Sequence, residues 1–206
     1  MTYKYLKLTL SDDILVKEGI SLTSGEYMKT DSEVKHDVAK IRNEVFKYGD
    51  DIIRSDRFQK AKHVRHHIQY TVAQHSVEVA MYALLITRWL KHYKIGRKIN
   101  EEDMVRAALL HDIGMTNDEV HDSPSYKKAF SHPLEGLRIA RDEFHLNPIQ
   151  LNAIKRHMWP IGIVPPSHLI GWILTTADNL SSLNEGLAMA KGKIRKAREK
   201  RSRGRG

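Results

Sequence analysis

The strongest local signal in this sequence is the stretch Ala-Ala-Leu-Leu-His-Asp-Ile-Gly at residues 107–114. It ends a helical pattern that begins after Asn100, a residue typical of helix N-caps. Asp112 follows Leu109 by three positions and Val105 by seven, which places its carboxylate on the apolar side of that helix. A carboxylate is rarely buried alone, because the loss of its hydration is costly. The stretch therefore predicts a helix whose inner face carries a charge that needs a metal ion, a salt bridge or a catalytic role.

The same feature recurs on two other predicted helices. His75 precedes Val79 by four positions on a helix predicted over about 70–93, and Asp178 follows Leu174 by four on the last core helix. Imidazole nitrogens and carboxylate oxygens together suit divalent ions such as Mn²⁺, Fe²⁺, Zn²⁺ and Mg²⁺. The predicted site collects His75, His111, Asp112 and Asp178.

Capping residues and helical spacing also place the remaining elements. We expect a helix over about 32–48, ended by Gly49. The polar segment 115–130 predicts a loop with a short helical turn, after which Ser131-His132-Pro133 opens a helix to about 144. Asn147-Pro148 starts the next helix, which stops at Pro160, and Pro165-Pro166-Ser167 starts the last core helix. The core shows no alternating strand pattern, so the sequence predicts an all-α helical domain over 32–189. Residues 1–31 form an N-terminal extension with no assigned structure.

Composition bounds the kind of protein. The chain has 206 residues, 41% of them hydrophobic, which is ordinary for a globular domain. It has no cysteine, so a metal must be held by His, Asp and Glu rather than by thiolates. No stretch reaches the roughly 18 apolar residues of a membrane span, and the start Met1-Thr2-Tyr3-Lys4 lacks the apolar region of a secretory signal. We expect a cytoplasmic protein of unassigned oligomeric state.

The positive charge of the chain is concentrated at its C-terminal end. Residues 191–206 hold nine Lys and Arg against one Glu, whereas the other 190 residues hold 25 Lys and Arg against 24 Asp and Glu. The domain itself is therefore nearly neutral. With almost nothing apolar to bury, residues 190–206 predict a basic, disordered tail. The tail could bind nucleic acid or another polyanion, or it could be a solvated appendage without a partner.

At this point the sequence resembles the HD-domain metal-dependent phosphohydrolases over about residues 60–185. The resemblance rests on the four residues above in that order, with Ala-Ala-Leu-Leu-His-Asp-Ile-Gly and Thr-Ala-Asp-Asn around the acidic ones. It implies an HD-type helical bundle in which the four residues hold a divalent ion. Members with two metals have further histidines in two intervals, which His132 and His157 match here. The resemblance thus implies a second ion held by those two residues, with Asp112 bridging both ions.

For single histidines, plainer interpretations stand beside this one. His132 could serve in helix capping, and His157 could interact with the dipole at a helix C-terminus. His66 and His67 precede the first ligand helix and would line the mouth of the pocket. The other histidines are expected in structural or surface roles: His36, His63, His92, His121, His145 and His168.

The resemblance implies hydrolysis of a phosphoester or phosphoanhydride, in a nucleotide-like compound, by a metal-activated hydroxide. Asp112 would be catalytic, with one or two ions among Mn, Fe, Mg, Zn and Ni. Lys127, Lys128 and Arg156 could contact substrate phosphates, or they could form a solvated basic face. The sequence departs from its relatives at two places that bear on the substrate. Many HD phosphodiesterases have a Lys soon after the His-Asp pair, as a candidate leaving-group acid or phosphate contact, whereas this chain has Ile113-Gly114-Met115. The Gly-Tyr-Pro signature of cyclic-di-GMP phosphodiesterases is also missing. The alternative is a non-catalytic HD module that binds metal, or regulates, and contacts nucleic acid through its tail.

Overall fold

A long apolar helix, α4 (Val72–His92), runs through the body of the protein. Its first turn is fixed by a capping box, in which the Thr71 hydroxyl accepts from the Gln74 amide and the Gln74 side chain accepts from the Thr71 amide. Helices α5 (Glu101–Leu110) and α9 (Leu169–Arg203) pack against α4. Its side chains are buried on most of its circumference, as expected for a central helix.

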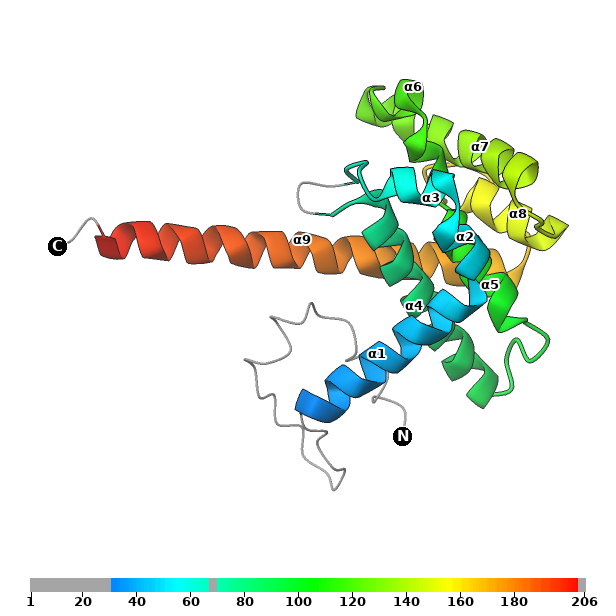
Figure 1. Cartoon of the computed structure of the whole chain (residues 1–206), viewed down its shortest axis with the longest axis horizontal. Coiled ribbons are helices and arrows are strands. Elements are labelled where there is room, and N and C mark those ends of the chain that lie inside the picture. The colour runs from blue at the N-terminus through cyan, green and yellow to red at the C-terminus, as the bar shows by residue number, and fades with distance from the viewer. Residues whose placement is uncertain (1–30, 67–69, 204–206) are drawn as a thin grey trace.

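The computed structural model describes residues 31–66 and 70–203 (Figure 1). In these ranges all the regular elements are helices, joined by turns and loops, and the only β-type pairing is an isolated bridge between Arg65 and Thr71. The all-α prediction is confirmed. None of the described helices is both long enough and apolar enough to cross a membrane. The remaining elements are α1 (Asp31–Tyr48), α2 (Asp50–Arg54), α3 (Asp56–Ala61), the 3₁₀ helix η1 (Ile113–Thr116), α6 (Asp118–His121), α7 (Ser125–Glu143) and α8 (Pro148–Arg156).

Several predicted helix ends agree with the structure. Asn100 caps α5, and Asn147 forms a capping box at the start of α8 with Pro148 in its first turn. The prediction that a helix opens at Ser131-His132-Pro133 is wrong, because α7 begins at Ser125 and passes through Pro133. A proline removes one backbone hydrogen bond from a helix, but α7 is packed against both η1 and α8, and this packing offsets the loss.

The predictions for the two ends of the chain have different outcomes. The predicted extension 1–31 lies outside the described residues except for Asp31, which begins α1. Where we expected a disordered tail from residue 190, α9 continues as a helix to Arg203. Lys, Arg, Ala and Glu are strong helix formers, so a basic segment that follows a helix can extend it without burying apolar surface.

Candidate metal centre

The structure brings the six predicted ligand residues together at the centre of the bundle. His75 comes from the first turns of α4, and His111 and Asp112 follow the last turn of α5. The other three come from later elements: His132 from α7, His157 from the end of α8, and Asp178 from α9. All are buried except Asp178, whose side chain is 16% exposed. Four helices and a helix-end turn, far apart in sequence, therefore point inward at one place.

Asp112 joins two groups of side chains through its two oxygens. Its Oδ1 lies 3.2 Å from His132 Nε2 and 3.4 Å from His157 Nε2. Its Oδ2 lies 3.5 Å from His111 Nε2 and 3.9 Å from His75 Nε2, and Asp178 Oδ1 is 3.0 Å from the same His75 nitrogen. We call His75, His111 and Asp178 the His75 group, and His132 and His157 the His132 group. One carboxylate thus stands between two potential ion sites, as a bridging ligand requires.

Gly114 allows the two groups to approach. A Cβ atom at this position would lie 2.1 Å from the His132 carbonyl oxygen and 2.6 Å from the Gly136 amide nitrogen. Only a glycine therefore lets η1 lie directly against α7. Since Asp112 immediately precedes η1 and His132 lies in α7, this contact sets the spacing between the bridging carboxylate and the His132 group.

The orientation of three imidazoles fits metal binding. His111, His132 and His157 each hydrogen-bond through Nδ1 to a carbonyl of their own chain segment, at 2.7, 2.7 and 2.8 Å. In a neutral ring this leaves a lone pair on Nε2, and in each case that atom faces Asp112. Among the described residues, His111 Nε2 is buried with no hydrogen-bond partner. The Nε2 atoms of His132 and His157 lie 3.0 Å apart. Lone pairs that face each other and a carboxylate repel unless a proton or cation lies between them, so this donor set suits a divalent ion.

The pKa values show the same demand for positive charge. Burial opposes a charge on His75, but hydrogen bonds to the Asp178 and Glu185 carboxylates outweigh it and raise its pKa to about 10. Burial lowers the pKa of His111 to about 4, so this ring stays neutral at physiological pH. Burial would raise the pKa of Asp112, yet the imidazoles around it hold that pKa well below its usual range. The centre thus keeps its carboxylate ionised and attracts cations.

Two further side chains complete the centre, and the sequence did not single them out as ligands. Glu185 Oε1 accepts from His75 Nδ1 at 2.9 Å, and Glu185 is 1% exposed. His66 Nε2 lies 2.9 Å from Asp112 Oδ2, and its ring stacks on His75 with centroids 3.9 Å apart. Among the described residues, ligand atoms within 4.8 Å of one another form three possible ion-binding groups: His66, His75 and Asp112; His75, His111 and Asp178; His111, Asp112 and His157.

Sequence signals for these two side chains differ. Glu185 lies seven residues after Asp178, which puts it two turns further along the same face of α9, and this spacing could have identified it. His66 was predicted only at the mouth of the pocket, and no periodic pattern marks it, because it lies between helices. His67 lies outside the described residues.

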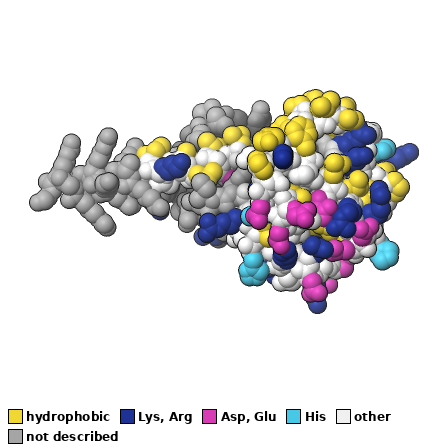
Figure 2. Space-filling view, turned by 90° about the horizontal axis from the view of Figure 1, so that it is seen from above, with side chains coloured by type: hydrophobic (Ala, Val, Ile, Leu, Met, Phe, Trp, Pro, Cys, Tyr) yellow, Lys and Arg dark blue, Asp and Glu magenta, His cyan; other side chains and the backbone are white. Residues whose placement is uncertain are grey.

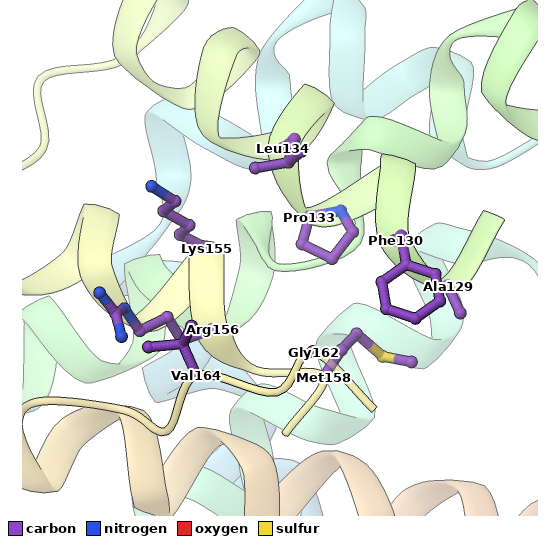
Figure 3. A pocket seen from close by; sticks show the side chains of 9 residues that line it. All are labelled: Ala129, Phe130, Pro133, Leu134, Lys155, Arg156, Met158, Gly162 and Val164. Carbon is purple, nitrogen blue, oxygen red and sulfur yellow. The ribbon is translucent and has the colours of Figure 1, made fainter. Parts of the chain in front are cut away.

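The predicted substrate contacts come from the start of α7 and the end of α8. Lys127 is exposed and Lys128 half-buried in the first turn of α7. The Arg156 guanidinium donates through Nη1 to the Pro165 carbonyl at 3.0 Å and lines a cavity of about 230 Å³. Figure 3 shows Lys155 and Arg156 on one side of this cavity and the apolar Phe130 and Met158 on the other. Pro133 and Met158 in its wall directly follow His132 and His157 in sequence.

Comparison with known proteins identifies one family. The family model for the HD domain matches residues 72–183, more than half of the chain. The match begins at the first residue of α4 and ends after Asp178, so it includes all six predicted ligands but neither His66 nor Glu185. No curated protein and no solved structure matches the chain.

Proposed function

Because this chain belongs to the HD-domain family, we propose that it is a metal-dependent hydrolase of a phosphoester or phosphoanhydride in a nucleotide-like compound. The observation that carries this proposal is the position of Asp112, with one oxygen facing the His75 group and the other facing the His132 group. A protein that used the pocket only to bind a single cation would not need this divided arrangement.

The residues of the centre would hold two divalent ions, with His75, His111, Asp112 and Asp178 around one and Asp112, His132 and His157 around the other. When bound, such ions supply positive charge to the phosphoryl group and make water acidic enough to provide hydroxide near neutral pH. Asp112 keeps its negative charge throughout, because its pKa is held low. The backbone carbonyls that accept from His111, His132 and His157 fix each ring in one tautomer and orientation.

The cavity between α7 and α8 supports a nucleotide-like substrate. Phe130 and Met158 offer apolar surface to a flat base, and Arg156 offers guanidinium donors to phosphate oxygens. We propose Arg156, Lys127 and Lys128 as the phosphate contacts.

The test uses the purified full chain, loaded with Mn²⁺ or Fe²⁺ and assayed on an aryl phosphate ester and then on a nucleotide panel. We expect turnover that Asp112→Ala abolishes and that His92→Ala, an exposed histidine on the same helix as His75, leaves unchanged. Elemental analysis should find two ions per chain in the wild type. Metal binding without turnover, equal in the wild type and Asp112→Ala, would instead support the non-catalytic HD module.

A further inference from the structure

Helix α9 changes character after Glu185. Up to this residue it belongs to the body, where Asn184 donates to Glu78 at 3.1 Å and Glu185 contacts His75. Beyond it the helix leaves the other elements behind (Figure 1). A Cβ atom added at Gly186 or Gly192 would meet no atom within 4 Å. The last half of α9 is therefore a projecting helix that packs on nothing in the described part of the chain at these positions.

A stripe of apolar side chains runs along this projecting helix. The stripe consists of Leu180, Leu183, Leu187, Ala190 and Ile194, spaced alternately by three and four residues. Leu180 packs against the core, but Leu183, Leu187 and Ile194 are 61%, 48% and 54% exposed. This alternation is the heptad pattern of a coiled-coil seam, in which the stripe residues occupy the a and d positions. Side chains of this size are seldom left exposed in a row unless another surface covers them.

Basic side chains flank the stripe. In the heptad that places Leu187 and Ile194 at a, Lys191 falls at e and Lys193 at g. Between Gly186 and Arg195 the sequence has no acidic residue, and only one occurs after that. Figure 2 shows Lys or Arg side chains beside hydrophobic ones where α9 leaves the body. The surface therefore combines an apolar seam with positive edges.

The apolar stripe and the basic side chains beside it together indicate what kind of partner binds this surface. A second copy of this helix would place lysines against lysines at the e and g positions, where like charges repel. Nucleic acid would satisfy the lysines but offers no apolar surface to the leucines. A membrane-bound helix has a broad apolar face that commonly includes aromatic residues, whereas this stripe is narrow and residues 186–195 contain no aromatic residue.

We propose that residues 183–194 of α9 form a docking surface for an amphipathic helix of a partner protein, with acidic residues flanking its own apolar stripe. The partner helix would cover Leu183, Leu187 and Ile194, and its acidic residues would pair with Lys191 and Lys193. Gly186 and Gly192 lower the stability of the projecting helix on its own. Contact with the partner helix would therefore also stabilise this part of α9. This proposal is independent of the hydrolytic function, since neither the exposed stripe residues nor Lys191 and Lys193 are placed in the metal centre.

The test measures binding of synthetic helical peptides to the full chain by fluorescence anisotropy. The acidic peptide, about three heptads long, carries Leu and Ile at a and d and Glu at e and g, and a matched peptide carries Lys at e and g. We expect the acidic peptide to bind the wild type and the Lys peptide not to bind. The double variant Leu187→Asp/Ile194→Asp should weaken binding by more than about tenfold, because two apolar contacts are lost. Ile149→Asp, at a comparably exposed position on α8, should leave it unchanged.

Charge reversal gives the sharper result. The double variant Lys191→Glu/Lys193→Glu should lose the acidic peptide and gain the Lys peptide, and circular dichroism should show that both double variants keep their helices. Equal binding of the two peptides, or binding that survives Leu187→Asp/Ile194→Asp, would overturn the proposal. The proposal would also be overturned if sedimentation showed that the wild type is a dimer and that Leu187→Asp/Ile194→Asp is a monomer. Preferential binding to phosphatidylserine vesicles or duplex DNA over the acidic peptide, lost in the same double variant, would assign the surface to those partners instead.

Discussion

The two groups around Asp112 are held in place by different means. In the His132 group, each imidazole donates to a carbonyl three or four residues back on its own helix, Lys128 for His132 and Ile154 for His157. In the His75 group, the His75 ring contacts the carboxylates of Glu185 and Asp178 on α9, more than one hundred residues away. His111, the other imidazole of the His75 group, is held by a local carbonyl, that of Ala108. The His132 group is therefore oriented by local backbone alone, whereas the His75 group also depends on charges from a distant helix.

This difference has a consequence for metal affinity. A carbonyl orients an imidazole without changing the net charge of the site, whereas a buried carboxylate behind the ring makes the ring a stronger electron donor. The His75 group also has the His66 imidazole next to it and includes the Asp178 carboxylate, so it offers more ligand atoms and more negative charge than the His132 group. We therefore expect the two groups to bind divalent ions with unequal affinity, the His75 group more tightly.

Removal of the charge shared by the two groups should have the largest effect, because both ion sites lose a ligand. Asp112→Asn keeps the size of the side chain but loses the charge that faces both groups. We expect hydrolytic activity to fall by more than about a thousandfold and the affinity of both ions to drop. Metal titration by calorimetry together with steady-state kinetics measures this. Retention of two tightly bound ions would show that Asp112 is not the bridge.

A methyl group at Gly114 should disturb the His132 group more than the His75 group. The added Cβ of Gly114→Ala would overlap the His132 carbonyl, so η1 and α7 must separate. We expect a loss of about 3 kcal/mol in the free energy of unfolding, measured by urea denaturation, and loss of the weaker ion first.

The control for this substitution is another glycine in the same chain. Gly186→Ala adds a methyl group in a helix with open space around it, so it should stabilise the protein by about 0.5–1 kcal/mol. If Gly114→Ala were as well tolerated, the close approach of η1 and α7 would not set the geometry of the centre.

Neutralising Glu185 tests the remote support of the His75 group. Glu185→Gln keeps a hydrogen-bond acceptor for His75 Nδ1 but removes the charge. We expect affinity for the tighter ion to fall roughly 10- to 100-fold while the weaker ion is unaffected. The matched control is Glu78→Gln, a neighbouring half-buried carboxylate that pairs with Asn184. An equal loss in both variants would indicate a general electrostatic effect rather than support of His75.

The same substitution should move a pKa in the metal-free protein. Since the Glu185 and Asp178 carboxylates raise the pKa of His75 to about 10, loss of one should lower it. Because the pKa of His75 is higher in the folded than in the unfolded state, its protonation stabilises the folded state. This contribution is complete below the unfolded pKa of about 6.5 and is lost as the pH rises to the folded pKa of about 10. The metal-free variant should therefore lose this contribution at a lower pH than the wild type, which urea denaturation at several pH values measures.

Features of the site that depend on local sequence could be predicted, whereas those that depend on contacts between distant segments could not. Helical spacing placed His75, Asp112 and Asp178 on inner faces, and capping residues located the starts of α5 and α8, because both signals lie within a few residues. The start of α7 was misplaced because Pro133 resembles a helix boundary unless its packing partners are known. The spacing of Glu185 from Asp178 places both on one face of α9, whereas the contact of His66 depends on how the segment before α4 is folded over the centre, which no local pattern encodes.

The smallest expected effect tests whether His66 belongs to the His75 group. Its Nε2 lies 2.9 Å from Asp112 Oδ2, but His66 is held by a short segment between α3 and α4 rather than by a helix. Such a ligand should contribute less than a helical one, so His66→Ala should weaken the tighter ion by a few-fold, on the order of 1 kcal/mol. The d–d absorption of the Co²⁺-loaded protein should also change, because a lost nitrogen ligand alters the ligand field. His63→Ala, on the same segment but exposed, should leave affinity and spectrum unchanged. If His66→Ala left both unchanged too, the imidazole would only cover the centre, and the inequality between the two groups would rest on Glu185 alone.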